Sequence, residues 1–84
     1  MMLFDPAKDA ANLEKHGVSL ARAEDMDIAI VIADDRHDYG EQRFRAFGLL
    51  DEAPHVLAFT FRGNTVRPIS LRRAHMREYR RHVR

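Results

Sequence analysis

Apolar and polar residues alternate most clearly between positions 55 and 73, where two short apolar runs flank the dipeptide Gly63-Asn64. A two-residue Gly-Asn connection is typical of a β-hairpin, because both residues tolerate positive φ angles. With these two residues as the loop, the register of the two strands follows. The predicted cross-strand pairs are Arg62–Thr65, Phe61–Val66, Thr60–Arg67 and Phe59–Pro68.

The predicted hairpin has two unlike faces, because successive side chains point to opposite sides of a strand. The apolar face holds Leu57, Phe59, Phe61 and Val66, and the polar face holds Thr60, Arg62, Thr65 and Arg67. Guanidinium and hydroxyl groups gathered on a rigid hairpin are suited to binding phosphate. The alternative is the ordinary solvated face of a strand. Pro68 indicates an edge or bulged strand, because proline has no N–H to donate to a neighbouring strand.

An N-terminal helix is predicted over residues 6–16. Asp5 is a good N-cap, Pro6 suits the first helical position, and Gly17 can end the helix. The residues expected to face inward are Phe4, Ala10 and Leu13, and the residues expected on one polar stripe are Lys8, Asn12 and Lys15. His16 lies beside this stripe at the negative end of the helix, where a cationic imidazole is favoured. The alternative is a solvated helix face.

The other predicted elements are a short helix over 20–26 capped by Ser19, a strand over 28–33, a polar turn over 34–40, a strand over 42–50, a turn over 51–54 and a terminal helix over 72–84. The run 28–33 is continuously apolar and largely β-branched, which predicts a strand buried on both faces. Gly48 within its strand predicts a bulge or a close approach.

In the terminal helix the expected apolar stripe is Met76, Tyr79 and Val83, and the residues expected to face water or a partner are Arg77, Arg80, Arg81 and Arg84. Short turns favour antiparallel neighbours. The expected fold class is therefore α+β, with N-terminal helices, a four-stranded and mainly antiparallel meander sheet, and a C-terminal helix.

The length of 84 residues predicts a single domain over residues 1–84. The chain has no cysteine, so a reducing compartment is compatible. It has no apolar run of membrane-spanning length and no signal-peptide layout, which predicts a cytoplasmic protein without a membrane partner. The sequence DDRHDYG over 34–40 contains residue types that bind metals, but its spacing matches no metal motif, so we expect a turn, no metal and no cofactor.

The formal net charge of +1 hides an asymmetry along the chain. Residues 1–52 hold twelve acids and six bases, giving −6, whereas residues 53–84 hold eight arginines and one glutamate, giving +7. Separated charge of this kind predicts a basic surface for a polyanion or an acidic partner. All the bases of the second part are arginine, the residue of bidentate phosphate contact.

Short motifs spread over nearly the whole chain resemble those of the BrnT family of bacterial type II toxins. They are Phe4-Asp5-Pro6, Lys8, Asn12, Lys15-His16-Gly17-Val18-Ser19, Asp35-Arg36, Tyr39-Gly40-Glu41, Arg43, Gly48, Phe59-Thr60-Phe61-Arg62, Arg67, Ile69-Ser70, Arg72-Arg73-Ala74 and Glu78-Tyr79. The resemblance implies a RelE-like fold and a metal-independent ribonuclease that arrests translation. It also implies a BrnA-like antitoxin partner that neutralises the toxin in a hetero-oligomer and binds DNA, with a ribbon-helix-helix-like build.

Metal-free RNA cleavage uses the ribose 2′-hydroxyl as nucleophile, a base to deprotonate it, a cation to stabilise the phosphorane and an acid to protonate the leaving 5′-oxygen. Arg62 and Arg67 are the candidates for holding the phosphate. The first candidates for acid or base are His16 and Lys15, and the weaker candidates are Glu41, Tyr79, His75, His37 and His55. The candidates for contacting RNA are Arg43, Thr60, Arg72, Arg73, Lys8, Asn12, Arg77 and Arg80.

A non-catalytic alternative remains open at this point. The same basic surface could bind nucleic acid or an acidic partner without cutting, because phosphate contacts alone give affinity and no chemistry. A neighbouring gene for a small ribbon-helix-helix-like protein would favour the toxin.

Overall fold

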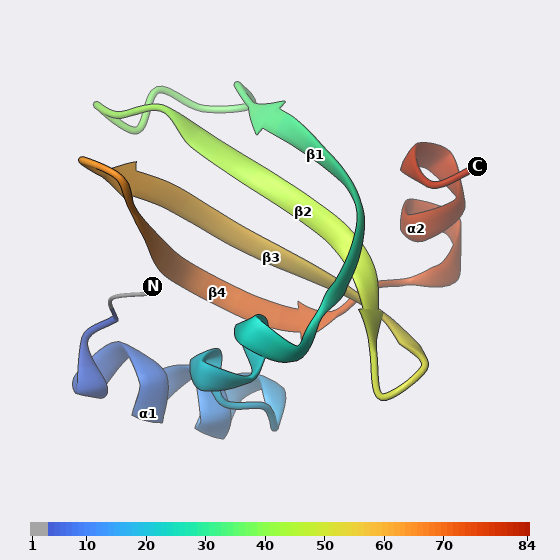
Figure 1. Cartoon of the computed structure of the whole chain (residues 1–84), viewed down its shortest axis with the longest axis horizontal. Helices are drawn as coiled ribbons and strands as arrows, with labels where there is room; N and C mark the ends of the chain where they lie inside the picture. The colour runs from blue at the N-terminus through green and yellow to red at the C-terminus, as the bar shows by residue number, and fades with distance from the viewer. Residues whose placement is uncertain (1–3) are drawn as a thin grey trace.

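The structure is a computed structural model and describes residues 4–84. Its elements are α1 (Pro6–His16), the 3-10 helix η1 (Leu20–Asp25), β1 (Asp27–Asp34), β2 (Arg43–Leu50), β3 (Ala53–Arg62), β4 (Thr65–Arg73) and α2 (Met76–His82). The strands form one antiparallel sheet in the order β1-β2-β3-β4 (Figure 1), which confirms the predicted α+β meander. No helix in the described range has the length and apolar character needed to cross a membrane.

The hairpin of β3 and β4 has the predicted loop and register. β3 ends at Arg62 and β4 begins at Thr65, and the four expected cross-strand pairs are all present. Gly63 adopts a φ of 61°, as the tight turn requires. Beyond Pro68 the register shifts, because Ser70 pairs with Ala58 and leaves Ile69 as an extra residue. The bulge and the position of β4 at an edge of the sheet confirm the expectation from proline.

Local capping explains where α1 begins and ends. The Asp5 carboxylate accepts a hydrogen bond of 2.8 Å from the Ala7 N–H, and Pro6 occupies the first helical turn. At the other end Gly17 adopts a φ of 75° and donates its N–H to the Leu13 carbonyl. The helix is therefore confirmed. Of the three residues expected to face inward, Phe4 packs against the core, but Leu13 is 52% exposed and Ala10 is also exposed.

Asn12 is the buried residue of α1, with only 6% of its surface exposed. Its Nδ2 donates to the Leu71 and Val18 carbonyls, both at 2.8 Å, and its Oδ1 accepts from the Leu71 N–H at 3.0 Å. The side-chain amide therefore bonds the β4 backbone as a neighbouring strand would. The prediction that Asn12 belongs to an exposed polar stripe is wrong, because α1 packs against the edge of β4.

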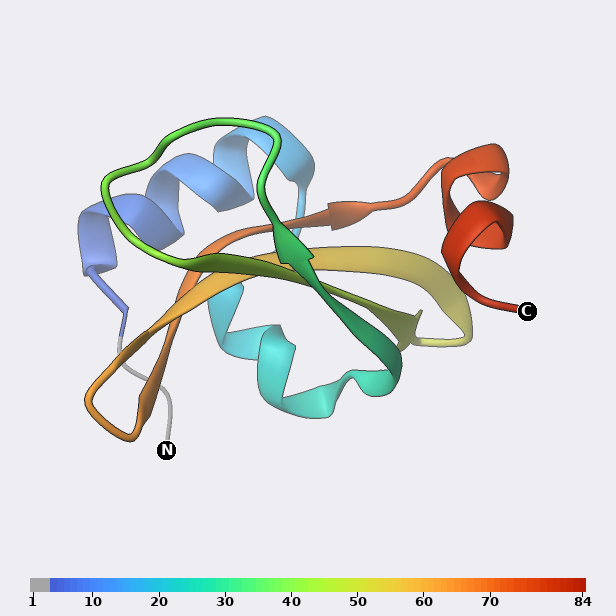
Figure 2. The ribbon, with the colours of Figure 1, turned by 90° about the horizontal axis from the view of Figure 1, so that it is seen from above.

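Two apolar clusters lie on opposite faces of the sheet. On one face, Leu20 and Ala23 of η1 pack with sheet residues including Leu57, Phe59 and Leu71. On the other face, Tyr79 and Val83 at the C-terminal end pack against a cluster whose buried members are Phe47, Val56 and Ala74. Figures 1 and 2 show α1 and η1 along β4, with α2 beyond the far end of the sheet. Part of the face toward α2 is thus left uncovered.

β1 and α2 differ from the expectations. β1 is an edge strand, and its Ile28 and Val31 are 45% and 48% exposed, so the prediction of a strand buried on both faces is wrong. A continuous apolar run does not reveal whether anything covers it. Gly48 does mark a close approach: an added Cβ would collide with the Asp27 carbonyl oxygen beside the irregular pairing of β1 with β2.

α2 begins at Met76 and not at residue 72, because β4 continues to Arg73. Met76 is largely exposed, so only Tyr79 and Val83 of the expected apolar stripe pack against the sheet. The four arginines expected to face water or a partner are exposed.

Asn12→Ala should lower the free energy of unfolding by about 2–4 kcal/mol, because it removes three hydrogen bonds and leaves two buried groups of Leu71 without partners. Urea unfolding followed by circular dichroism measures the change. Glu14→Ala, at an exposed position of the same helix, is the control and should change the value by less than about 0.5 kcal/mol. Equal stabilities for the two variants would contradict the role given to Asn12.

Candidate functional site

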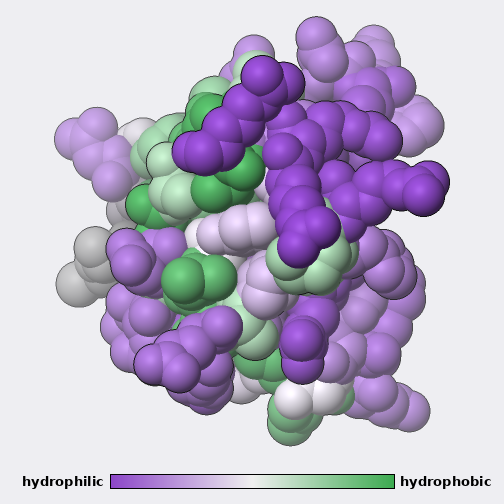
Figure 3. All heavy atoms as spheres, turned by 90° about the vertical axis from the view of Figure 1, so that its right-hand side faces the viewer, coloured by the Kyte–Doolittle hydropathy of each residue, from purple (hydrophilic) through white to green (hydrophobic). Residues whose placement is uncertain are grey.

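Five arginines point to the same face of the sheet as α2. We call this set the arginine face, and its members are Arg43, Arg45, Arg62, Arg67 and Arg72. The assignment follows from the register, since residues paired across strands share a face. Arg45 pairs with Ala58 of β3, and Arg43, two residues earlier on β2, shares the face of Arg45. Val56, Thr60 and Arg62 share the face of Ala58, and Val56 and Thr60 pair with Arg72 and Arg67 of β4. Seen from the α2 end, hydrophilic side chains dominate the surface (Figure 3).

Arg62 and Arg67 lie on one side of the hairpin, as the sequence predicted, and neither forms an ion pair within residues 4–84. Arg62 is exposed and Arg67 is half-buried. Thr60 lies between β2 and β4 but is buried, and its hydroxyl donates to the Gln42 carbonyl at 2.6 Å. That hydroxyl is therefore occupied inside the protein, unlike the exposed contact that the sequence suggested.

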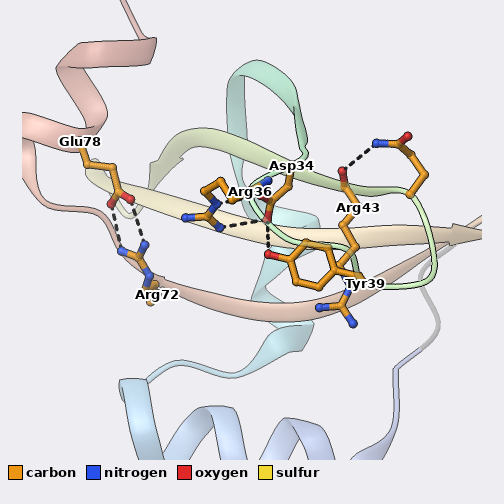
Figure 4. A network of polar contacts seen from close by, with 7 residues as sticks. Asp34, Arg36, Tyr39, Arg43, Arg72 and Glu78 are labelled. Atoms are coloured by element: carbon orange, nitrogen blue, oxygen red, sulfur yellow. Dashed lines mark hydrogen bonds and ion pairs between the residues drawn. The ribbon is translucent and has the colours of Figure 1, made fainter.

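Arg43 is held by the loop between β1 and β2. Its Nε donates to Glu41 at 3.1 Å, and its guanidinium carbon lies 4.2 Å from the centre of the Tyr39 ring. Tyr39 in turn donates its hydroxyl to Asp34 at 3.2 Å (Figure 4). Glu41, a predicted acid or base, is thus an ion-pair partner of Arg43.

Asp34 anchors the same loop. Its carboxylate is buried and accepts two hydrogen bonds from Arg36, of 2.8 and 2.9 Å (Figure 4). Hydrogen bonding to Arg36 lowers the pKa of Asp34 from 3.8 to about 2, although burial opposes the shift. Within the described residues, no group of three or more His, Cys, Asp or Glu side chains is arranged to hold a metal ion.

Arg72 forms another of the polar contacts drawn in Figure 4. Its two terminal nitrogens each donate to one Glu78 oxygen at 3.0 Å, which is the bidentate geometry that a phosphate would also accept. The hydrogen bonds from Arg72 lower the pKa of Glu78, against the effect of burial. Sequence reasoning did not select Glu78 as a site residue, because its contact with Arg72 depends on where α2 packs.

Arg45 was also missed, although its alternation with Arg43 along β2 places both on one face. Its guanidinium carbon is 5.5 Å from the centre of the Phe47 ring, and its positive charge helps to lower the pKa of Glu78. Arg45 therefore lies between the Arg43 end and the Arg72 end of the arginine face.

A shallow groove of about 250 Å³ runs between α1 and β4. The residues that line this α1 groove are Lys8, Ala11, Asn12, Lys15, His16, Ile69 and Ser70. Burial lowers the pKa of His16, and the charges of Lys15 and Arg72 lower it further. These effects favour the neutral imidazole, whereas the negative end of the helix alone would favour the cation.

The predicted site residues divide into two groups. His16 lies near Arg72, as the effect of Arg72 on the His16 pKa indicates, and Lys15 lines the same groove as His16. Arg67 is five positions before Arg72, which corresponds to roughly 15 Å along a strand. His16 therefore lies toward the Arg72 end of β4, whereas Arg62 and Arg67 lie at the end beside the Gly63-Asn64 turn.

The other predicted RNA contacts are scattered. Arg73 pairs with His55 and belongs to the opposite face of the sheet from Arg72. Arg77 and Arg80 are exposed on α2, and Lys8 is exposed on α1. Within the predicted set, the structure brings together the arginines of one face and, separately, the cations of the α1 groove.

Comparison with known families gives one match. The family described as "Ribonuclease toxin, BrnT, of type II toxin-antitoxin system" matches residues 4–78 of the 84-residue chain. The matched region includes all of the arginine face and the α1 groove. No curated protein matches the chain.

Replacing Asp34 should destabilise the protein more at neutral pH than in acid. The pKa of Asp34 falls from 3.8 to about 2 on folding, so its stabilisation is complete above about pH 5 and is lost as the pH falls toward 2. Because Arg36 is half exposed, we expect a loss of only about 1–2 kcal/mol for Asp34→Asn at pH 7. Urea unfolding at pH 7, 5 and 3 measures it, and a difference that grows as the pH falls would contradict this assignment.

Proposed function

This chain belongs to the BrnT family of ribonuclease toxins of type II toxin–antitoxin systems, and we propose that it cleaves RNA without a metal ion and thereby arrests translation. The observation that carries the proposal is the pair Arg62 and Arg67 on one open strand face. Neither has a carboxylate partner among the described residues, so both guanidinium groups are available to an anionic ligand.

In this proposal Arg62 and Arg67 bind the phosphate that is cleaved. The 2′-hydroxyl of the preceding ribose attacks the phosphorus, the bond to the 5′-oxygen breaks, and the products are a 2′,3′-cyclic phosphate and a free 5′-hydroxyl. The transition state carries more negative charge on the phosphoryl oxygens than the substrate does. Two preorganised guanidinium groups stabilise that charge without any rearrangement during the reaction.

Arg43 and Arg45 extend the positive surface across β2. Contact with Tyr39 and Glu41 holds the Arg43 guanidinium in place, which supports a role in orienting the RNA backbone. Glu41 is the carboxylate tied to this end of the face, so it remains a candidate proton acceptor there. Its carboxylate is already engaged by Arg43, which favours catalysis dominated by charge and position.

We assign the α1 groove to a second part of the RNA chain. Lys8 and Lys15 offer cations, and the neutral His16 and the Ser70 hydroxyl offer hydrogen bonds. A separation of roughly 15 Å from Arg67 to Arg72 spans more than one nucleotide. This reading predicts an extended, single-stranded substrate that follows β4.

The expected partner is an antitoxin, as the type II family implies. We propose that it is BrnA-like, binds DNA through a ribbon-helix-helix-like fold, and forms a hetero-oligomer with this chain in the cytoplasm.

Arg62→Ala and Arg67→Ala should each lower the rate of RNA cleavage by at least about 100-fold, because each removes a donor to the phosphoryl oxygens. The assay uses purified protein and RNA in excess EDTA, with mapping of the cleaved ends. Arg81→Ala is the matched control, since Arg81 is an exposed arginine of α2 outside the proposed site.

We expect the wild-type protein to produce RNA ends with a cyclic phosphate and both variants to lose them. Expression of either variant should also no longer arrest growth. RNA that stays intact with the wild-type protein, but still binds it, would replace the proposal with a non-catalytic binding function.

His16→Gln should lower the cleavage rate at saturating RNA by less than about tenfold and should mainly raise KM, because His16 lines the α1 groove near Arg72, which is assigned to a second part of the RNA chain. The comparison of kcat and KM over pH 5–9 measures this. A loss of about 100-fold or more in kcat, with a flattened pH profile, would identify His16 as the general base and move the chemistry to the α1 groove.

A further inference from the structure

The two edges of the sheet are treated differently by the rest of the chain. Along β4, α1 covers the edge, and Asn12 bonds the backbone of Leu71. β1 hydrogen bonds to β2 alone, and Figure 1 shows it at the border of the sheet away from α1. One edge is therefore closed from within the chain, and the other is open in the described structure.

β1 lacks most of the features that protect an edge strand. It is eight residues long, contains neither lysine nor proline, and carries the exposed side chains of Ile28 and Val31 on one face. Long apolar edges of this kind are templates for pairing with another strand. The acids at its ends and the irregular pairing near Ala29 are the only protective features of β1.

The charges at the ends of β1 select the kind of strand that fits. Glu24 and Asp27 lie at its beginning and Asp35 and Asp38 lie just after its end, all exposed and without ion pairs in the described chain. A second copy paired antiparallel along this edge would bring acids against acids at both ends, which is unfavourable. RNA phosphates would meet the same acids.

We propose that the open edge of β1 binds an extended segment of the antitoxin as a fifth strand of the sheet. The segment has apolar, β-branched residues at its centre, which cover Ile28 and Val31. It carries lysine or arginine at both ends, which face the acids. This inference rests on the antitoxin partnership of the proposed function and not on the chemistry of the arginine face.

The test uses this chain and the small protein encoded by the gene next to it. Hydrogen–deuterium exchange is measured for the complex and for the free chain. The backbone amides of β1 should exchange at least tenfold more slowly in the complex. Val31→Lys should weaken binding at least tenfold in a titration, because it places a cation and a long side chain where the apolar centre docks. Leu13→Lys is the control, since Leu13 is about as exposed on α1 as Val31 is on β1. The affinity of this variant for the partner should stay within twofold of the wild-type affinity.

Unchanged exchange in β1 on complex formation, or full affinity of a folded Val31→Lys variant, would overturn the inference. So would a dimer of the chain alone that Val31→Lys dissociates in sedimentation, since the occupant would then be a second copy. RNA cleavage in EDTA by the same variants separates the two proposals. The Val31→Lys variant should cleave RNA like the wild type and should resist inhibition by the partner. If no sample cleaves RNA, the ribonuclease mechanism is rejected, but the inference about β1 is not.

Discussion

The arrangement of the functional surfaces depends on the side-chain amide of Asn12. By donating to and accepting from the backbone of Leu71, it joins α1 to the edge of β4. Because the same amide also bonds the Val18 carbonyl, it fixes the segment that leads into η1. The consequence is that the helix lies beside the strand and leaves the sheet face toward α2 open for the arginines. It also places Lys15 and His16 beside Ile69 and Ser70 of β4, and so creates the α1 groove.

The arginine face combines two kinds of guanidinium. Arg43 and Arg72 are held by Glu41 and Glu78, while Arg45, Arg62 and Arg67 have no such partner among the described residues. Like charges gathered on one face repel, and the interspersed carboxylates reduce that cost while leaving part of the positive charge for a ligand. Glu78 occupies on Arg72 the geometry of a bidentate phosphate contact. The hairpin end of the face is the part that a phosphate reaches without displacing a carboxylate.

Sequence reasoning worked where local geometry decides the outcome. The Gly63-Asn64 turn defines the register of the hairpin, and with it the face shared by Arg62 and Arg67. The caps Asp5 and Gly17 define α1. It failed where tertiary packing decides: Leu13 and Asn12 exchange their expected environments, because the amide has a backbone partner that lies 59 residues away in the sequence. The open edge of β1 and the separation of His16 from Arg67 likewise depend on which elements pack together. A local sequence pattern does not predict that packing.

The central claim is that the arginines at the hairpin end hold the phosphate where RNA is cut. The most direct test is a crystal structure of the chain with a short RNA whose nucleophilic hydroxyl is blocked as 2′-O-methyl. The account predicts that the phosphate following the methylated ribose lies within hydrogen-bond distance of both Arg62 and Arg67. A phosphate bound instead between Arg72 and His16, or on the sheet face that carries Arg73, would contradict it.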